Sequence, residues 1–392
     1  MKTIYIDCTS SVPIKNQPFH GGANYTYALL SELQKRKYDE HEFVLLLPEG
    51  LYPGSVVGES VYNSGFYNVL IIKSLSDDLN LKENSTLFFP LLYRPADYKS
   101  LKKIKQNNPS VKIVATIHDM RHLFNKYGSL SRFYYTGLIF FFYSFLKPAR
   151  VLYNAFFLNP VIRRGIQEID TVFTDSNYSL QQIMKFRYKG NILPHNLPLK
   201  PRQSNEAKKP EHKYFLFLSG NRAVKNLLRT LEAFCLFKKT DDKDYYLYVT
   251  GVDKELINKF QRYKKIDKDI VDKWVRLFGY VDDNELNDLY LNCSVLLFTS
   301  LAEGYGLPIL EAAQHGKPSI SSYTTSVPEV LGSCTYYIDP YDAKSILKGM
   351  EYMSQEHNIK QYEKWLSEYY PVMEKRTGTD LDVIFYHITS DR

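Results

Sequence analysis

Two glutamates with seven residues between them, Glu303 and Glu311, are the side chains in this sequence with the clearest potential for chemistry. Carboxylates accept hydrogen bonds from vicinal hydroxyls, such as those of a ribose and a hexose, and backbone N–H groups at a helix start bind phosphates. The segment therefore indicates a site for a ligand that carries both sugars and phosphates. The residues between the glutamates begin with Gly304, Tyr305, Gly306 and Leu307.

The predicted strand and helix around this segment would place it at the edge of a β-sheet where ligands bind. It follows the apolar run 294–300, which is typical of a buried parallel strand, and it leads into a helix near Pro308. In open α/β sheets, ligands bind at the carboxyl ends of the strands. Glu311 also has a structural explanation, because a carboxylate in the first helical turn favours the helix dipole. Glu303 precedes the glycines in a loop and has no such explanation.

A basic pair, Arg222 and Lys225, precedes a second predicted helix that starts at about Leu227. Together with the backbone N–H groups at that helix start, the pair would form a diphosphate site. The alternative interpretation is two solvated surface cations. Because cations are unfavourable at the positive end of a helix, their position favours an anionic ligand that compensates them.

Two weaker signals lie in the first half of the chain. His118 follows a predicted strand, where it can point into a cleft, although a lone histidine is more often a structural hydrogen-bonding group. Gly21 and Gly22 precede a helix predicted from about Thr26, and glycines there let the backbone approach a ligand. The segment lacks the Gly-x-Gly-x-x-Gly spacing, which counts against an NAD enzyme.

Strand-like and helix-like segments alternate twice along the chain, which predicts an α/β protein with two doubly wound parallel-sheet domains. At 392 residues the chain also exceeds the roughly 250–300 residues at which one core stops growing. The predicted domains are 1–200 and 213–360, followed by a helical segment, 361–392, that packs back toward the first domain. Within that segment only 383–386 looks like a strand. The predicted strands are 2–7, 42–47, 69–72, 86–89, 112–117 and 171–174, and then 214–218, 246–250, 275–278, 295–298, 318–321 and 335–338.

Composition narrows the class of protein. With 44% hydrophobic and 24% charged residues the chain is typical of globular proteins. Its net charge of +7 includes no long Lys/Arg block, which argues against nucleic acid as a partner. Four separated cysteines predict neither a metal site nor a disulfide framework and fit a reducing cytosol. No signal-peptide pattern opens the sequence, and no apolar run reaches the roughly 20 residues of a transmembrane helix.

The aromatic segment 133–146 has two open interpretations. It contains Phe140, Phe141 and Phe142, carries no charge, and is followed by Lys147 and Arg150. It fits a buried helix under a lid and equally a monotopic contact with a membrane surface.

Two further patterns indicate structure rather than chemistry. Ser326 and Glu329 match a capping box at a helix start. The string Asp242-Lys243-Asp244 lies in a charged stretch and reads as a solvated loop, so no metal site is predicted.

Four blocks, 278–286, 303–311, 316–318 and 326–330, resemble the retaining, nucleotide-sugar-dependent glycosyltransferases of family 4. The resemblance is strongest to members that build bacterial surface polysaccharides. It continues more loosely upstream through Lys225-Asn226, 170–176, 117–119 and Gly21-Gly22. It implies the GT-B fold, in which two Rossmann-like domains face each other across a cleft.

The resemblance implies roles for the matching residues in the second domain. Glu311 would bind the ribose and Glu303 the hydroxyls of the donor sugar, with residues 304–307 near that sugar and the diphosphate. Tyr280 and Val281 would lie beside the nucleobase, and Lys225 would bind phosphate.

Four other residues complete the comparison. His118 corresponds to a histidine near the donor sugar, and Gly21-Gly22 to a loop near the diphosphate and the acceptor. Arg222 departs from the family pattern, which has an arginine directly before the lysine or several positions upstream of it. Here Val224 occupies the first place and Arg222 stands three residues before the lysine.

The activity implied is retaining transfer of a hexose, mannose being the first expectation, to a glycan or lipid-linked acceptor without a metal or cofactor. GDP-mannose is the first expected donor, followed by UDP-hexose and dTDP-rhamnose. Lys225, Arg222 and helix amides would stabilise the leaving diphosphate. The expected location is the cytoplasm, and peripheral contact with the anionic inner face of the membrane stays open.

Two alternatives to a retaining transferase remain. One is an epimerase or an inverting transferase with the same fold. The other is a non-catalytic scaffold, which is disfavoured because His118, Lys225, Glu303 and Glu311 are all present.

Overall fold

The computed structural model describes residues 1–12, 21–36, 38, 40–75, 79–120, 134, 149, 151–199, 210–240, 244–264 and 266–391. The chain divides into two compact units. Unit 1 comprises residues 1–124, 150–200 and 374–392, and unit 2 comprises residues 125–149 and 201–373. The predicted linker lies largely outside the described residues. So does the aromatic segment 133–146, apart from Tyr134.

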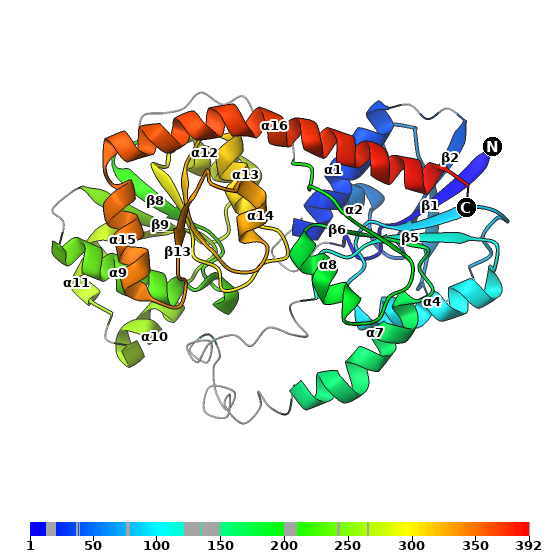
Figure 1. Cartoon of the computed structure of the whole chain (residues 1–392), viewed down its shortest axis with the longest axis horizontal. Helices are drawn as coiled ribbons and strands as arrows, with labels where there is room; N and C mark the ends of the chain where they lie inside the picture. The colour runs from blue at the N-terminus through cyan, green and yellow to red at the C-terminus, as the bar shows by residue number, and fades with distance from the viewer. Residues whose placement is uncertain are drawn as a thin grey trace. The chain divides into compact units, whose positions relative to one another are not determined.

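Unit 1 is built on a seven-stranded parallel sheet with the order β3-β2-β1-β4-β5-β6-β7 (Figure 1). Of these strands only β7 was not predicted, because it is four residues long, incompletely buried and ends in proline. The elements of unit 1 are β1 (Lys2–Asp7), α1 (Gly21–Lys35), β2 (His41–Pro48), α2 (Pro53–Val57), α3 (Glu59–Tyr62), β3 (Asn68–Ile72), β4 (Thr86–Phe89), α4 (Pro95–Asn107), β5 (Lys112–Thr116), the π-helical η2 (Asn154–Leu158), α7 (Asn159–Ile166), β6 (Thr171–Thr174), α8 (Asn177–Met184) and β7 (Asn191–Pro194).

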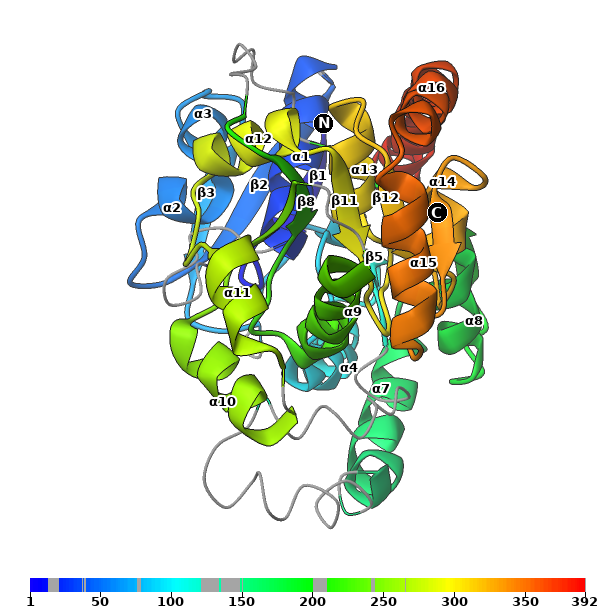
Figure 2. The ribbon, with the colours of Figure 1, turned by 90° about the vertical axis from the view of Figure 1, so that its left-hand side faces the viewer.

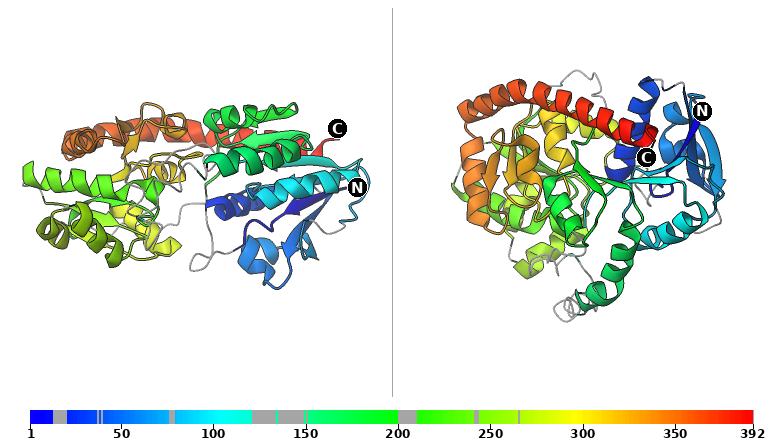
Figure 3. Two further views of the ribbon diagram at one scale, coloured as in Figure 1. Left: turned by 90° about the horizontal axis from the view of Figure 1, so that it is seen from below. Right: turned by 45° about the vertical axis from the view of Figure 1, so that its right-hand side comes forward.

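The helices α4 and α7 pack closely against each other beside this sheet (Figure 3). Gly165 of α7 permits the contact, because a Cβ atom at this position would lie 2.2 Å from the backbone oxygen of Tyr98 in α4. Tyr98, Leu101 and Ile166 join residues of β4, β5 and β6 in one buried cluster. α7 is therefore held firmly against the body of unit 1.

Unit 2 is built on a six-stranded parallel sheet with the order β10-β9-β8-β11-β12-β13. All six strands were predicted to within one residue at each end. The elements of unit 2 are β8 (Lys213–Phe217), the 3₁₀ turn η3 (Ala223–Lys225), α9 (Leu227–Thr240), β9 (Tyr245–Val249), α10 (Lys254–Lys264), α11 (Lys268–Trp274), β10 (Val275–Leu277), α12 (Asp283–Asn292), β11 (Val295–Phe298), α13 (Leu307–Gln314), β12 (Ser319–Ser322), α14 (Val327–Leu331), β13 (Tyr336–Ile338) and α15 (Ala343–Met353).

One face of this sheet is covered by α9 and α15, which lie side by side (Figures 1 and 2). Successive side chains of a strand point to opposite faces. Phe215 and Phe217 of β8 therefore join Phe234 of α9 and Met350 of α15 in one buried cluster. The other face is left to the helices that carry the candidate site.

The last helix, α16 (Glu356–Thr389), begins in unit 2 and ends in unit 1. The strand predicted at 383–386 is wrong. The buried residues Leu381, Ile384, Phe385 and Ile388 follow helical rather than alternating spacing.

Cations from unit 1 bind the carbonyl groups at the end of α16. Lys2 donates to the oxygen of Thr389 at 3.2 Å, and Lys112 donates to that of Ser390 at 3.2 Å. Positive charge is favourable at the C-terminus of a helix. The two ends of the described chain consequently lie close together in unit 1 (Figures 1 and 3).

Each sheet has a switch point, where the order of the strands reverses. It lies between β1 and β4 in unit 1 and between β8 and β11 in unit 2. Ligands of open α/β sheets bind outside the carboxyl ends of the strands at such points. The loops after these four strands are therefore the first places to look for a site.

Candidate functional site

An ion pair between Lys225 and Glu303 occupies the switch point of unit 2. Lys225 ends the turn that follows β8, and Glu303 lies in the loop that follows β11. The Lys225 Nζ atom is 2.8 Å from Glu303 Oε1, and each residue is only 6% exposed. Nζ also lies 4.8 Å from the ring centre of Phe298. The structure thus brings together two predicted site residues that are 78 positions apart.

The position of Lys225 depends on the next residue, Asn226. Asn226 has a left-handed backbone with φ of 71°, which asparagine tolerates better than most residues. Its buried side-chain amide donates to the oxygens of Thr299 at 3.2 Å and Pro340 at 2.7 Å. The turn that carries the lysine is thereby tied to the end of β11. Asn226 was part of the resemblance but was not predicted as a site residue.

The loop that carries Glu303 is held by Thr325 and Ser326. The Glu303 N–H donates to Thr325 Oγ1 at 2.9 Å, and the Ser326 hydroxyl is within hydrogen-bonding distance of the oxygens of Glu303 and Tyr305, at 3.0 and 2.9 Å. The predicted capping box is therefore wrong. The hydroxyl of Ser326 is directed to the loop, and the Glu329 N–H bonds to the backbone oxygen of Ser326 instead.

Glu311 lies on α13, close to the same loop. Because α13 begins at Leu307, with Gly306 as its N-cap at φ of 128°, Glu311 is its fifth residue and not in the first turn, as predicted. The helix-dipole explanation for Glu311 is correspondingly weaker. Its carboxylate instead accepts a hydrogen bond of 2.6 Å from the Tyr290 hydroxyl.

Tyr290 is a site residue that the sequence did not reveal. Burial and the charge of Glu311 raise the pKa of this phenol well above its usual value, so it keeps its proton and donates. Its ring stacks on His315, whose Nε2 atom is 2.8 Å from the side-chain oxygen of Asn287. The Glu311 carboxylate is therefore held from one side.

Three other predicted donor-binding residues of unit 2 are more exposed than the ion pair. Arg222 is exposed just before η3. Tyr280 is exposed and Val281 is half-buried, both following β10, which is separated from β8 by β9. The Arg222 backbone belongs to the same turn as Lys225, whose N–H donates to the Arg222 oxygen at 2.9 Å, whereas Tyr280 and Val281 follow a strand two places from β8 in the sheet.

In unit 1, His118 follows β5, which ends at Thr116. Its Nε2 atom is 3.2 Å from the backbone oxygen of Pro90, and its Nδ1 atom is 3.7 Å from Asp175 Oδ2. Burial raises the pKa of the Asp175 carboxyl, an effect opposed by the hydrogen bond and charge of His118.

Two further side chains surround His118. Tyr25 meets its ring edge-on, with the ring centres 4.7 Å apart, and the Tyr25 hydroxyl is 3.2 Å from Nε2 of His195. Burial and the nearby His118 lower the pKa of His195 to about 3, so His195 is neutral. Sequence reasoning did not select Asp175 or His195, although both directly follow strands at the same sheet edge.

The glycine pair Gly21-Gly22 begins helix α1, so this helix starts five residues earlier than predicted. A Cβ atom on Gly22 would lie 2.7 Å from Cδ2 of Leu91. Packing against Leu91 thus gives a structural reason for the absence of a side chain at position 22, and the predicted ligand contact stays a prediction.

The switch point of unit 1 contains a buried carboxyl group, Asp7. One of its oxygens accepts from the Thr9 N–H at 3.1 Å, and among the described residues the other has no hydrogen-bond partner. Burial raises its pKa from 3.8 to about 7. Because the folded state binds this proton more tightly than the unfolded state, stability from this group is lost as pH rises from about 4 through about 7.

We therefore expect Asp7→Asn to be about 1–3 kcal/mol more stable than the unmodified protein at pH 8, with most of that gain lost at pH 4. Urea unfolding at both values measures this difference. Asp272→Asn, at an exposed position, is the control and should leave the pH dependence unchanged. If the free energy of unfolding depends on pH in the same way for Asp7→Asn and the unmodified protein, the raised pKa of Asp7 is contradicted.

In the part of the chain that the structure describes, no three His, Cys, Asp or Glu side chains gather as metal ligands. The four cysteines are buried and unpaired. No helix of the same part is long and apolar enough to span a bilayer.

Comparisons with known proteins come from sequence and from fold. The family model for "Glycosyl transferases group 1" matches residues 200–368. O-antigen chain mannosyltransferase B of Escherichia coli is 31% identical over 136 residues, which cover 34% of each protein. The chain thus spans about a third of the length of this curated relative.

Two solved structures match nearly the whole chain in fold. A glycosyltransferase from Rickettsia africae has a TM-score of 0.68 at 14% identity and covers 100% of this chain and 99% of its own. Anabaena HepE, solved with UDP and glucose, has a TM-score of 0.64 at 12% identity and covers 99% of this chain and 98% of its own. These likenesses confirm the predicted GT-B fold with its two Rossmann-like domains.

Proposed function

We propose that this GT-B-fold chain is a glycosyltransferase that moves a hexose from a nucleotide diphosphate sugar to a glycan or lipid-linked acceptor. Its setting would be the synthesis of bacterial surface polysaccharide such as O-antigen. The match of residues 200–368 to group 1 glycosyl transferases supports the reaction class. Similarity to an O-antigen mannosyltransferase makes mannose the first expected sugar and GDP-mannose the first expected donor.

The buried Lys225–Glu303 pair at the switch point is the observation that carries this proposal. A lysine and a glutamate kept adjacent in a poorly solvated place match a ligand that has a diphosphate next to a hydroxyl-rich ring. Glu311, farther along α13, would receive the ribose hydroxyls. The N–H groups at the start of α13 would face the phosphates.

The mechanism we propose is transfer with retention at the anomeric carbon and without a metal. The bond between that carbon and the diphosphate oxygen breaks, and the acceptor oxygen bonds to the same face of the sugar. Lys225 would stabilise the charge that develops on the leaving diphosphate. The leaving phosphate takes the acceptor proton, and His118 would contact the donor sugar.

A panel of nucleoside diphosphates and their sugars tests this proposal by thermal shift. We expect a guanine nucleotide to raise the Tm by several degrees. A ligand at a hundredfold excess over its Kd adds about 2.7 kcal/mol to the free energy of unfolding. Mannose transfer from GDP-mannose should then be detected with an added acceptor. If no nucleoside diphosphate raises the Tm, the transferase proposal fails.

Variants of the proposed ribose site test whether Glu311 and Tyr290 contribute to nucleotide binding. Glu311→Gln should weaken every nucleotide by about 10- to 100-fold, because it removes a charged hydrogen-bond acceptor. Tyr290→Phe, which keeps the carboxylate but removes its 2.6 Å donor, should weaken binding by about fivefold. Glu374→Gln, at an exposed position, is the control. If all three variants bind nucleotides equally well, Glu311 does not contact the nucleotide.

The cytoplasmic face of the inner membrane is the location we propose for this reaction, with the protein bound peripherally. This location follows from the class of acceptor. The aromatic segment first considered for membrane contact lies almost entirely outside the described residues.

A further inference from the structure

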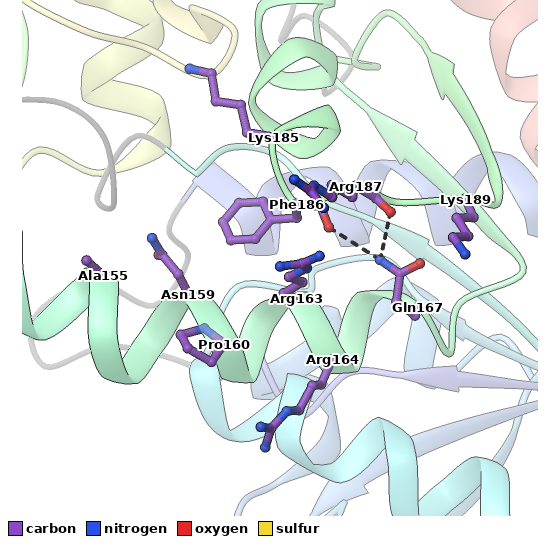
Figure 4. Close-up of a pocket in the computed structure, with 10 residues that line it drawn as sticks. All are labelled: Ala155, Asn159, Pro160, Arg163, Arg164, Gln167, Lys185, Phe186, Arg187 and Lys189. Carbon is purple, nitrogen blue, oxygen red and sulfur yellow. Dashed lines mark hydrogen bonds between the residues drawn. The ribbon is translucent and has the colours of Figure 1, made fainter.

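A cationic pocket lies between α7 and the turn after α8 in unit 1, away from the predicted site residues. Its volume is about 970 Å³. Its lining includes no carboxylate, and half of its ten residues are basic. Figure 4 shows the basic side chains, which are Arg163, Arg164, Lys185, Arg187 and Lys189.

Four of these five charges have no ion pair among the described residues. Within the described residues, no ion pair joins Arg163, Arg164, Arg187 or Lys189 to an acidic side chain, and Lys185 donates to the neutral amide of Gln182 at 2.8 Å. Like charges held close together repel each other, so the cluster is stabilised when an anion binds.

The floor of the pocket is held in place by hydrogen bonds and packing. The side-chain amide of Gln167 donates to the oxygens of Phe186 at 3.4 Å and Arg187 at 3.2 Å, which ties α7 to the turn (Figure 4). The Phe186 side chain is buried. Because Gly165 also packs α7 onto α4, the arginines of α7 project from a fixed helix.

An apolar surface adjoins this pocket along the same helical run. Phe156 is 71% exposed and Phe157 is 64% exposed, and Leu152 and Tyr153 are also exposed. Arg163 and Arg164 follow the two phenylalanines by seven residues, a spacing that keeps side chains near one face of a helix. Exposed aromatic rings thus continue the row of cations.

We propose that the cationic pocket and this aromatic surface together bind the surface of an anionic phospholipid membrane. Lipid phosphates would enter the pocket, and Phe156 and Phe157 would insert at the boundary between headgroups and acyl chains. A soluble phosphate would need only the cations. The adjoining exposed phenylalanines favour a membrane, because transfer of their rings from water to an apolar medium lowers the free energy.

The proposal is tested with the full chain and sedimented vesicles, without nucleotide sugar, so its outcome is independent of the proposed activity. We expect binding to vesicles of phosphatidylcholine with 30% phosphatidylglycerol, weak binding to phosphatidylcholine alone, and weakening as salt rises. Arg163→Gln/Arg187→Gln should lower the partition coefficient by about 10- to 30-fold, since each basic residue near such a surface contributes about five- to sixfold. Phe156→Ser should lower it by about tenfold.

Matched controls separate this surface from general charge and hydrophobicity. Lys99→Gln/Lys102→Gln removes two exposed charges from α4, and Tyr386→Ser removes an aromatic ring that is 66% exposed on α16. Both should bind anionic vesicles nearly as the unmodified protein does. Equal loss in controls and pocket variants would overturn the proposal. So would stabilisation by inorganic phosphate without vesicle binding, which would assign the pocket to a soluble anion.

Discussion

Replacing Lys225 with methionine is expected to lower turnover by at least about 100-fold and to destabilise the protein by about 3–5 kcal/mol. The loss of turnover follows from the role proposed for the ammonium group at the leaving diphosphate. The loss of stability follows because Glu303, only 6% exposed, would keep its charge without its partner 2.8 Å away. Steady-state kinetics and urea unfolding measure the two effects separately.

A double-variant cycle distinguishes the structural role of the pair from its role in the reaction. Glu303→Gln alone should also destabilise, since it leaves the lysine ammonium without its buried partner. The combination of Lys225→Met with Glu303→Gln should regain most of the lost stability, because no uncompensated charge remains. Turnover should stay low in the combined variant. If turnover returns together with stability, the pair is structural and the mechanism proposed for Lys225 is wrong.

Replacing His118 with alanine is expected to lower kcat by about 100-fold while nucleotide affinity changes little. The reason is that His118 is proposed to touch the donor sugar, whereas the residues proposed to bind the ribose and the nucleobase are on unit 2. Initial rates and nucleotide titrations measure kcat and Kd. His357→Ala, at an exposed histidine, is the control.

The surroundings of His118 provide a second variant for this prediction. Asp175→Asn should lower kcat less than His118→Ala does, because it changes only the group 3.7 Å from Nδ1 of the histidine. Unchanged kcat in His118→Ala would exclude a catalytic role. A loss of nucleotide affinity equal to the loss of kcat would instead mean that His118 acts in binding.

Much of the fold could be predicted because most of the buried strands are short apolar runs. The run at 295–298 coincides with β11, and residues just beyond such runs include Glu303, Lys225 and His118. The prediction failed where apolar spacing alone had to decide between two structures. Residues 383–386 contain a β-branched and aromatic run, yet their buried neighbours Leu381 and Ile388 belong to one face of a helix.

The residues that hold the site in place could not be predicted from the sequence. Ser326 follows Glu303 by 23 residues, and Tyr290 precedes Glu311 by 21. Nothing local to either segment reports such a contact. The capping-box pattern at Ser326 was misleading, because the same hydroxyl can serve the helix or the loop and tertiary contacts decide which.

Helix α16 has a consequence for how the chain folds during synthesis. Domains usually fold in the order in which the ribosome produces them, at about 5–20 residues per second. Here unit 1 includes residues 374–392, which emerge after every residue of unit 2. Its buried contacts with Leu381, Ile384 and Phe385 must wait roughly 10–40 seconds after residue 200 is made. The unit that begins first is therefore expected to be completed last, with an apolar surface open to chaperones in the interval.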